Sequence, residues 1–481
     1  MESHEKRTII KNIKWLTISK IIVYLLSILT ITLIPRYLGV EGYGQLNFII
    51  SFVSLFSIIG DLGLYTLIVR DISKNPDKAN EYFNNLLLFR IIIIFIFLII
   101  VGVFAIILQS APITNLIIIY SVGVGIGLLT NFDLAFLNGF QEIKYQAISD
   151  AIQKIVYTLG VIVVIIYNYK LNGIIFAAAI SYVFMFIYSF VTINKLILIN
   201  KLNFNFNYIK KMTIQSSPFI LTSIFWMIYF NIDRIFITYF KGNYATGLYS
   251  ISYTFLWFLL SIITILNTTF FPILSKFSED KSKLEGIVKK YIYLLYLFII
   301  PVTIGGIYLA PKIISLVFGS QYLDGTIAFQ IIMLFFLLNS IGILNYYLLI
   351  TNHLEKYSFQ ILGISAITNF LLNFLFIPWL GIIGAALTTI ISEIVIFIGS
   401  YIKIRKIISI DYISQAIKPL FAGIFMLMGL ILYYYIFPKG IIHNKFEVLL
   451  SIFIGGLIYV FLLFMTKSIT KNQILEILKK S

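Results

Sequence analysis

The 481-residue chain is 60% hydrophobic and 12% charged, with a mean hydropathy of +0.98. This composition excludes a water-soluble globular domain, in which charged residues make up about a quarter of the chain. There is no cysteine, which excludes disulfides and cysteine-ligated metal ions. A net charge of +16 would suit a nucleic-acid partner in a soluble protein, so its meaning depends on where the basic residues lie.

Long apolar stretches take up most of the chain. We predict fourteen of them, each of about 20–26 residues, with twelve or thirteen as the nearest alternative count. At 1.5 Å per residue, each crosses a hydrocarbon core about 30 Å thick as a helix. The gaps are too short for a further folded domain, so we predict an all-α integral membrane protein. The spans are residues 13–34, 45–69, 86–108, 114–137, 147–167, 173–193, 213–237, 249–273, 291–310, 325–350, 357–377, 381–400, 417–436 and 446–466.

Lysine and arginine residues gather in alternate gaps between these spans. We count 25 of them on one side of the membrane and 6 on the other. Because the side with more positive charge faces the cytoplasm, we expect a multi-pass protein of the cytoplasmic membrane with both termini inside the cell. The basic surplus then indicates orientation and contact with anionic membrane lipids, with no nucleic-acid partner. The tail, residues 468–480, fits either a short amphipathic helix on that surface or a solvated segment.

Motifs of enzymes and cofactor sites are missing from the sequence. It holds no glycine-rich phosphate loop, no serine-nucleophile elbow and no acidic cluster in a large loop, and its three histidines are scattered. The glycines Gly123, Gly125 and Gly127 lie inside a span, where small residues let helices approach closely. We therefore expect no enzyme activity, no metal and no cofactor. A chain of this kind is most often a transporter, less often a channel or an assembly scaffold.

On the cytoplasmic half of the early spans we single out Lys20, Asp61, Arg90 and Lys154 as charged residues inside the membrane. Placing each of these charges in the membrane costs about 2.5–3.5 kcal/mol on insertion scales, so each calls for a structural or functional explanation. Lys20 and Lys154 lie about 10 Å deep at 1.5 Å per residue. Arg90 could extend to the interface, and either lysine could pair with Asp61. Alternatively, the four helices face a water-filled cavity in which three cations against one acid attract an anionic substrate.

The later spans hold a second group of polar residues. Asp233 and Arg234 stand together near one end of a span, and Glu393 lies near the middle of another. Glu393 could be a protonated structural acid, a partner for a cation, or an ion-coupling group. Asn369 and Asn373 share one helix face, a spacing more typical of contacts between helices than of a sugar-binding surface.

A short pattern occurs twice, six spans apart. Residues 37–46 and 239–249 each form a predicted outer loop with an aromatic residue, then Gly, Tyr and Gly, and the second copy has one extra residue. A six-span offset predicts two parallel lobes related by an axis normal to the membrane. We predict an N-terminal lobe at 1–211, a C-terminal lobe at 212–410, and two last helices with a cytoplasmic tail at 411–481.

Several loose motifs occur in a specific order over most of the chain. They are Arg36-Tyr37-Leu38-Gly39, Glu41-Gly42-Tyr43-Gly44, Asp61-Leu62-Gly63-Leu64, Asp233-Arg234, Gly247-Leu248-Tyr249, Phe318-Gly319, Gln321-Tyr322, Asn369 with Asn373, Pro378, Gly381 and Gly384-Ala385-Ala386. In this order and spacing the sequence resembles the Wzx-type polysaccharide flippases of the multidrug/oligosaccharidyl-lipid/polysaccharide exporter superfamily.

The resemblance implies fourteen helices in two six-helix lobes plus two C-terminal helices. It also implies a flippase that carries an oligosaccharide on undecaprenyl pyrophosphate from the inner to the outer leaflet by alternating access, for cell-surface polysaccharide biosynthesis. The expected partners are this lipid-linked oligosaccharide, membrane lipids and other polysaccharide-assembly proteins. A drug or cation exporter of the same superfamily, and a membrane-bound glycan polymerase or ligase, are the alternatives.

The candidate site residues fall into two groups. The family motifs mark Asp61, Asp233 and Arg234, whereas the others rest on their depth in the membrane alone. The residues expected to contact the head group are Lys20, Arg90, Lys154 and Arg234. The residues expected to act as charge partners or coupling acids are Asp61, Asp233 and Glu393.

Overall fold

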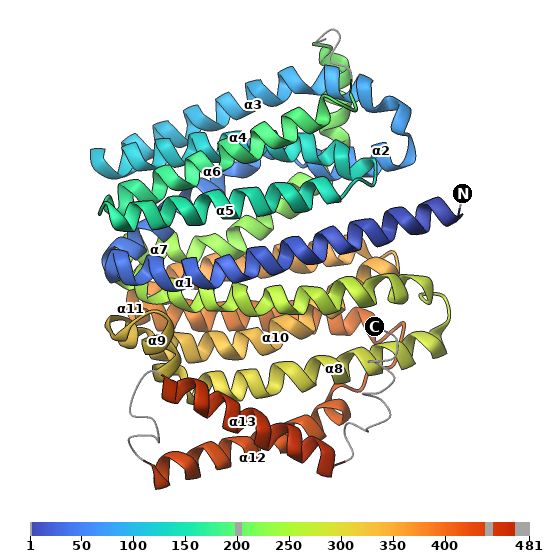
Figure 1. Cartoon of the computed structure of the whole chain (residues 1–481). Coiled ribbons are helices and arrows are strands. Elements are labelled where there is room, and N and C mark those ends of the chain that lie inside the picture. Colours follow the sequence, from blue (N-terminus) through green and yellow to red (C-terminus); the bar gives the residue numbers. More distant parts are fainter. Residues whose placement is uncertain (1, 198–203, 438–445, 467–481) are drawn as a thin grey trace. The chain divides into compact units, whose positions relative to one another are not determined.

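The computed structural model describes residues 2–197, 204–437 and 446–466, and the regular structure in these ranges is entirely helical (Figure 1). The predicted amphipathic tail therefore lies outside the described residues. The helices are α1 (Glu2–Asp61), α2 (Leu64–Lys74), η1 (Pro76–Lys78), α3 (Ala79–Leu108), α4 (Ala111–Gly139), α5 (Lys144–Ile166), α6 (Lys170–Ile193), α7 (Phe206–Lys276), α8 (Lys281–Tyr308), α9 (Ala310–Val317), η2 (Ser320–Gly325), α10 (Thr326–Thr351), α11 (Glu355–Ile404), α12 (Tyr412–Ile436) and α13 (Phe446–Met465).

Three of these helices are too long for one membrane crossing. α1, α7 and α11 contain 60, 71 and 50 residues and are interrupted at Gly39, Gly242 and Gly381. Each of these glycines has a positive φ, which breaks the helix and which residues with a Cβ rarely adopt. Within the described ranges, 11 helices are long and apolar enough to span a membrane. Because the three kinked ones are each long enough for two crossings, the predicted all-α membrane fold with about fourteen transmembrane helices is confirmed.

The segments between spans differ from the prediction in two places. Residues 37–46 and 239–249, predicted as outer loops, are helical apart from the kink glycine. The predicted span 45–69 is broken, because Leu62 and Gly63 both have positive φ, at 47° and 64°. α1 therefore ends before Leu62, and α2 leaves in a new direction. Apolar composition continues through the break, which is why hydropathy alone did not reveal it.

The chain divides into two compact units, Met1–Gly247 and Leu248–Ser481. In the first unit, α4 packs against α3 and α6, α5 packs against α6, and α1 lies along α5 (Figure 1). Part of its core is a cluster around the buried rings of Phe83, Phe132 and Phe136, whose centroids lie 5.2–5.4 Å apart. In the second unit, α10 packs against α11 and α8, and α12 packs against α8 and α13.

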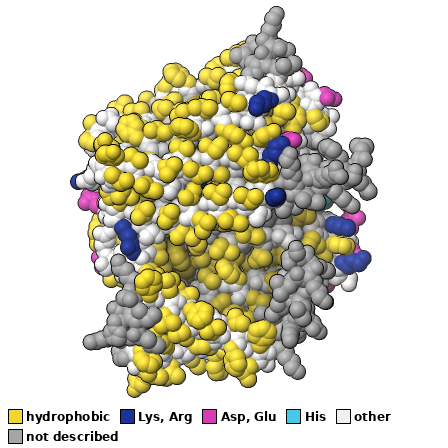
Figure 2. Space-filling model, viewed as in Figure 1, with side chains coloured by type: hydrophobic (Ala, Val, Ile, Leu, Met, Phe, Trp, Pro, Cys, Tyr) yellow, Lys and Arg dark blue, Asp and Glu magenta, His cyan; other side chains and the backbone are white. Residues whose placement is uncertain are grey.

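The outward surface of the helices is that of a membrane protein. Figure 2 shows hydrophobic side chains over most of the visible face, with the charged side chains toward helix ends. Large apolar side chains such as Ile107, Trp379 and Phe461 are 71%, 87% and 63% exposed. In water this exposure would drive aggregation, whereas in hydrocarbon it carries no penalty.

Two helices, α8 and α12, begin with an aspartate cap. The Asp280 carboxylate accepts a hydrogen bond from the backbone N–H of Lys283 at 3.1 Å and caps α8, and Asp411 caps α12 in the same way through Ser414 at 3.0 Å. The Lys283 ammonium donates a further bond to Asp280 at 2.9 Å, which lowers the pKa of that carboxyl. Both aspartates thus remain ionised at neutral pH and favour the positive end of the helix dipole.

The kinks in α1 and α7 bring two helices into very close contact within the first unit. A Cβ built on Gly44 would lie 1.8 Å from the carbonyl oxygen of Asn243, and one built on Gly247 would lie 2.0 Å from that of Val40. Gly44 follows the kink glycine Gly39 by the same number of residues as Gly247 follows Gly242. The contact is therefore reciprocal, each helix placing its glycine on the backbone of the other. From the kink glycine onward the two copies of the pattern align without a gap, so the extra residue of the second copy lies before Gly242.

Candidate functional site

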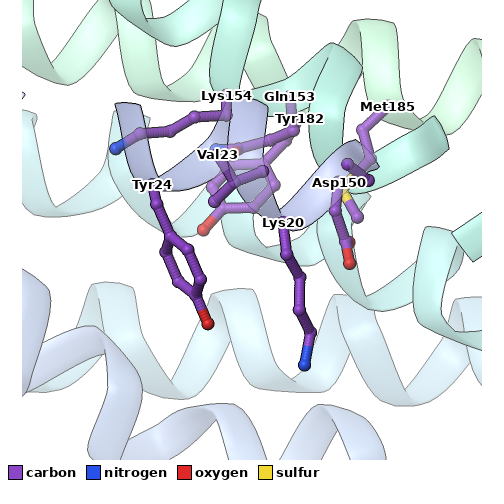
Figure 3. Close-up of a pocket in the computed structure, with 9 residues that line it drawn as sticks. Lys20, Val23, Tyr24, Asp150, Gln153, Lys154, Tyr182 and Met185 are labelled. Carbon is purple, nitrogen blue, oxygen red and sulfur yellow. The ribbon is translucent and has the colours of Figure 1, made fainter. Parts of the chain in front are cut away.

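A cavity of about 390 Å³ lies in the first unit between the first part of α1, α5 and α6. Figure 3 shows the side chains of Lys20, Tyr24 and Asp150 extending toward the same side, with Lys154 projecting from α5. The volume falls within the range of small-molecule sites in proteins, which is about 300–1,000 Å³. The lining residues are Ser19, Lys20, Val23, Tyr24, Asp150, Gln153, Lys154, Tyr182 and Met185.

Side-chain hydrogen bonds hold the walls of this cavity together. The Ser19 hydroxyl donates to the backbone oxygen of Ala147 at 2.5 Å, which ties α1 to the start of α5. The Gln153 amide donates to the Ser181 hydroxyl at 3.1 Å, which ties α5 to α6. Such bonds fix the positions of the helices that form the cavity walls. They matter inside a membrane, because the hydrophobic effect does not drive helices together there.

The cavity holds two lysines and one acid. Lys20 and Lys154, both predicted as head-group contacts, line it together. The Lys154 ammonium donates to the Thr30 hydroxyl at 2.9 Å, a neutral partner that leaves its charge uncompensated. Lys20 and Asp150 form no ion pair with each other in the described part of the chain. One positive charge therefore remains in excess, which suits an anionic ligand.

Asp150 was missed in the sequence, although a signal for it exists. It stands one helical turn before Lys154 inside a predicted span, so the two share a helix face. Asp133 was missed in the same way. It is 2% exposed on α4 and accepts a hydrogen bond from the Ser189 hydroxyl at 2.8 Å. The predicted count of three cations against one acid is therefore wrong, since the early spans hold three acids, and the positive excess exists only inside the cavity.

Arg90 and Asp61 form a buried ion pair away from this cavity. Arg90 on α3 is 1% exposed, and its Nη2 lies 3.1 Å from an Asp61 carboxylate oxygen. Its guanidinium also donates to the backbone oxygens of Asp61 and Leu128, at 2.9 and 2.8 Å. The partner considered for Asp61 was a lysine, but the structure places Arg90 there. Because Arg90 also bonds the last carbonyl of α1, it holds the break between α1 and α2.

Asp233 and Arg234 lie in the first part of α7 and are both buried. Asp233 is 1% and Arg234 is 7% exposed, and an Arg234 Nη1 atom donates to the Ser51 hydroxyl on α1 at 3.1 Å. Both belong to the first compact unit, although they occur in the seventh predicted span. Neither lines the cavity that holds Lys20 and Lys154.

Glu393 lies in the second unit and is buried between helices. It is 1% exposed and accepts a hydrogen bond from the Asn339 amide at 3.1 Å. Gly342 makes room for it, because a Cβ there would lie 2.5 Å from Glu393 Oε1. Nearby on α11, the Asn373 amide donates to Asn369 at 2.9 Å, and both residues are fully buried. Asn373 also accepts a hydrogen bond from the Thr388 hydroxyl beyond the interruption at Gly381, so it joins the two parts of α11 and acts in helix packing.

The fold and the cavity together define a class of protein, an all-helical integral membrane protein with a polar cavity inside its first unit. The chain belongs to the polysaccharide biosynthesis protein family, whose model matches residues 9–278. The resemblance predicted from the sequence is thereby confirmed at the level of a polysaccharide biosynthesis family.

Known relatives and solved structures agree with this assignment. The chain is 24% identical over 412 residues to the capsular polysaccharide biosynthesis protein CapF of Staphylococcus aureus, covering 83% of this chain and 100% of CapF. Its fold is similar to the lipid II flippase MurJ in an inward closed conformation, with a TM-score of 0.77, 18% identity, and coverage of 93% of this chain and 97% of MurJ. It is also similar to an inward-facing multidrug resistance MATE transporter, with a TM-score of 0.61, 15% identity, and coverage of 80% and 94%. These two likenesses concern the fold alone, and their two-lobe architecture agrees with the predicted fold class.

Proposed function

We propose that this protein is a flippase that moves an oligosaccharide linked to undecaprenyl pyrophosphate from the inner to the outer leaflet of the cytoplasmic membrane. The observation that carries the proposal is the convergence of Lys20 and Lys154 on one cavity with a positive excess. A pyrophosphate needs cationic groups when it leaves water, because desolvated charges are costly unless they are paired. The lipid tail stays in the bilayer while the head group crosses.

The two lobes would transport the substrate by alternating access about a fixed site. From the distribution of lysine and arginine we infer that both termini are cytoplasmic. An ion gradient, the membrane potential or removal of the product would supply the driving force. Glu393, Asp233 and Asp61 remain proposed as charge partners or coupling acids. No covalent change in the glycan is expected, which separates this function from a polymerase or ligase.

The deciding experiment is reconstitution of the full chain into vesicles with a fluorescent undecaprenyl-pyrophosphate-linked oligosaccharide. A membrane-impermeant reagent added outside would follow the appearance of the label in the outer leaflet. We expect transport well above that of protein-free vesicles and a chemically unchanged substrate. A rate equal to that of empty vesicles would refute the flippase, and a lengthened or transferred glycan would favour the polymerase or ligase.

The cavity itself is tested by removing its lysines one at a time. We expect Lys20→Ala and Lys154→Ala each to lower the transport rate about tenfold or more, because a hydrogen bond to a charged group contributes about 1.5–3 kcal/mol. Lys14→Ala is the matched control, since Lys14 is an exposed lysine on the same helix that does not line the cavity. Normal abundance and thermal stability of each variant would exclude misfolding. Parental rates in both cavity variants would show that the basic cavity is not the head-group site.

The drug-exporter alternative is supported by the MATE fold and by Asp150 in the cavity. It predicts that Asp150→Asn abolishes efflux of a cationic dye from vesicles, whereas the flippase predicts little dye transport in the parent. The excess lysine favours the flippase, because a site for cationic drugs would hold an excess of acids.

A further inference from the structure

A second cavity of about 370 Å³ lies in the first unit, near the kinks of α1 and α7 and the turn between α3 and α4. It lies at the end of α3 opposite the gap that carries Lys74 and Lys78. By the distribution of basic residues, this is the outer side of the membrane. The lining residues are Gln45, Phe48, Phe52, Leu108, Gln109, Ile113, Ile235, Thr238, Tyr239 and Asn243.

The chemistry of this lining is unlike that of the lysine cavity, since none of its ten residues is charged. Three of the lining residues, Gln45, Gln109 and Asn243, carry side-chain amides that form no hydrogen bond with another group in the described part of the chain. Each amide offers two donors and an acceptor. The cavity therefore presents unused neutral hydrogen-bonding groups to whatever enters it.

Aromatic rings form part of the remaining wall, together with the aliphatic side chains of Leu108, Ile113 and Ile235. Phe48 and Phe52 are each 4% exposed, and their ring centroids lie 5.7 Å apart, so they are packed in place and form a rigid surface. Tyr239 is 82% exposed at the rim. Flat aromatic faces beside amides match a sugar ring, which has an apolar C–H face and a rim of hydroxyl groups.

Other occupants fit this lining less well. A pyrophosphate or an anionic lipid head group would find no cation, and an acyl chain would leave three amides without partners, which is costly away from water. A cationic drug would find no carboxylate. The uncharged part of a glycan satisfies both the amides and the rings.

We propose that this cavity is a subsite for neutral sugar residues, occupied by the glycan of the lipid-linked substrate on the outer side. The inference rests on the proposed flippase function and divides the substrate between two places. The lysine cavity takes the charged pyrophosphate, and the amide cavity takes uncharged sugars. Asn243 carries the backbone oxygen that faces Gly44, and Gln45 is the next residue after Gly44, so two of the three lining amides stand at the reciprocal contact of α1 and α7.

The test compares two substrates in the vesicle assay, one with the full oligosaccharide and one with a single sugar on undecaprenyl pyrophosphate. We expect the double variant Gln45→Leu/Asn243→Leu to lower transport of the full oligosaccharide about tenfold and of the single-sugar lipid less than twofold. Lys20→Ala should lower both. Asn115→Leu is the control, since Asn115 is an exposed amide at the start of α4 that does not line the cavity.

A direct binding measurement separates this inference from the flippase proposal. Saturation-transfer NMR on the purified full chain should detect a soluble neutral oligosaccharide with the parent and with Asn115→Leu, and show loss of the signal with the double variant. This result would support the subsite even if no transport were seen. Equal losses for both transport substrates, or no oligosaccharide signal with the parent, would overturn it.

Discussion

Replacing Gly44 or Gly247 by alanine is expected to destabilise the protein by about 2–3 kcal/mol, because it forces α1 and α7 apart where they are in contact. The added methyl groups would lie 1.8 and 2.0 Å from backbone carbonyl oxygens of the facing helix. Backbone atoms cannot rotate away as a flexible side chain would, so α1 and α7 would have to separate. The measurement is thermal unfolding of the full chain in detergent, together with transport in vesicles.

The control for these variants is Gly102→Ala on α3. No heavy atom lies within 4 Å of the position its Cβ would take, and alanine favours the helix by up to about 1 kcal/mol. We therefore expect Gly102→Ala to be neutral or slightly stabilising. If Gly44→Ala and Gly247→Ala matched Gly102→Ala in both stability and transport, the reciprocal contact would not be a feature of the working protein.

The second large effect is expected at the buried ion pair of Arg90 and Asp61. Arg90→Met should cost about 3–5 kcal/mol, because it leaves Asp61 without its cation and two backbone carbonyls without their donor. We expect low abundance in the membrane fraction and a clearly lower melting temperature. The double variant Arg90→Met/Asp61→Asn should recover part of the loss, since it removes both charges.

Arg70→Met is the matched control, because Arg70 is 45% exposed and forms its ion pair with the adjacent Asp71 at the surface. It should change stability by less than about 1 kcal/mol. The experiment also decides between two roles for Arg90. If Arg90→Met kept parental stability and lost transport, Arg90 would contact the substrate, as the sequence predicts, and would not be a structural residue.

Some residues of the candidate site could be predicted from the sequence, and others could not. Lys20 and Lys154 were found because a charge inside an apolar span is conspicuous, and the structure brings them to one cavity. Arg90 was found for the same reason, but its pairing with Asp61 depends on how α3 lies against the end of α1. Asp150 could have been found by its spacing from Lys154. The amides of the second cavity could not have been predicted from the sequence, because single amides near the ends of spans are common. Only the fold brings these three to one cavity.

The sequence by itself determined the class of this protein, its approximate number of spans and its expected orientation. These properties depend on hydropathy and on charge between the spans, which are summed along the chain and do not require knowing which helices touch. The tertiary structure alone decided that the two predicted outer loops are kinked helices and which charges are paired. It also decided that α1 and α7 are in contact at Gly44 and Gly247. A glycine at positive φ and a contact between distant helices leave the local composition unchanged, so no pattern along the chain reveals them.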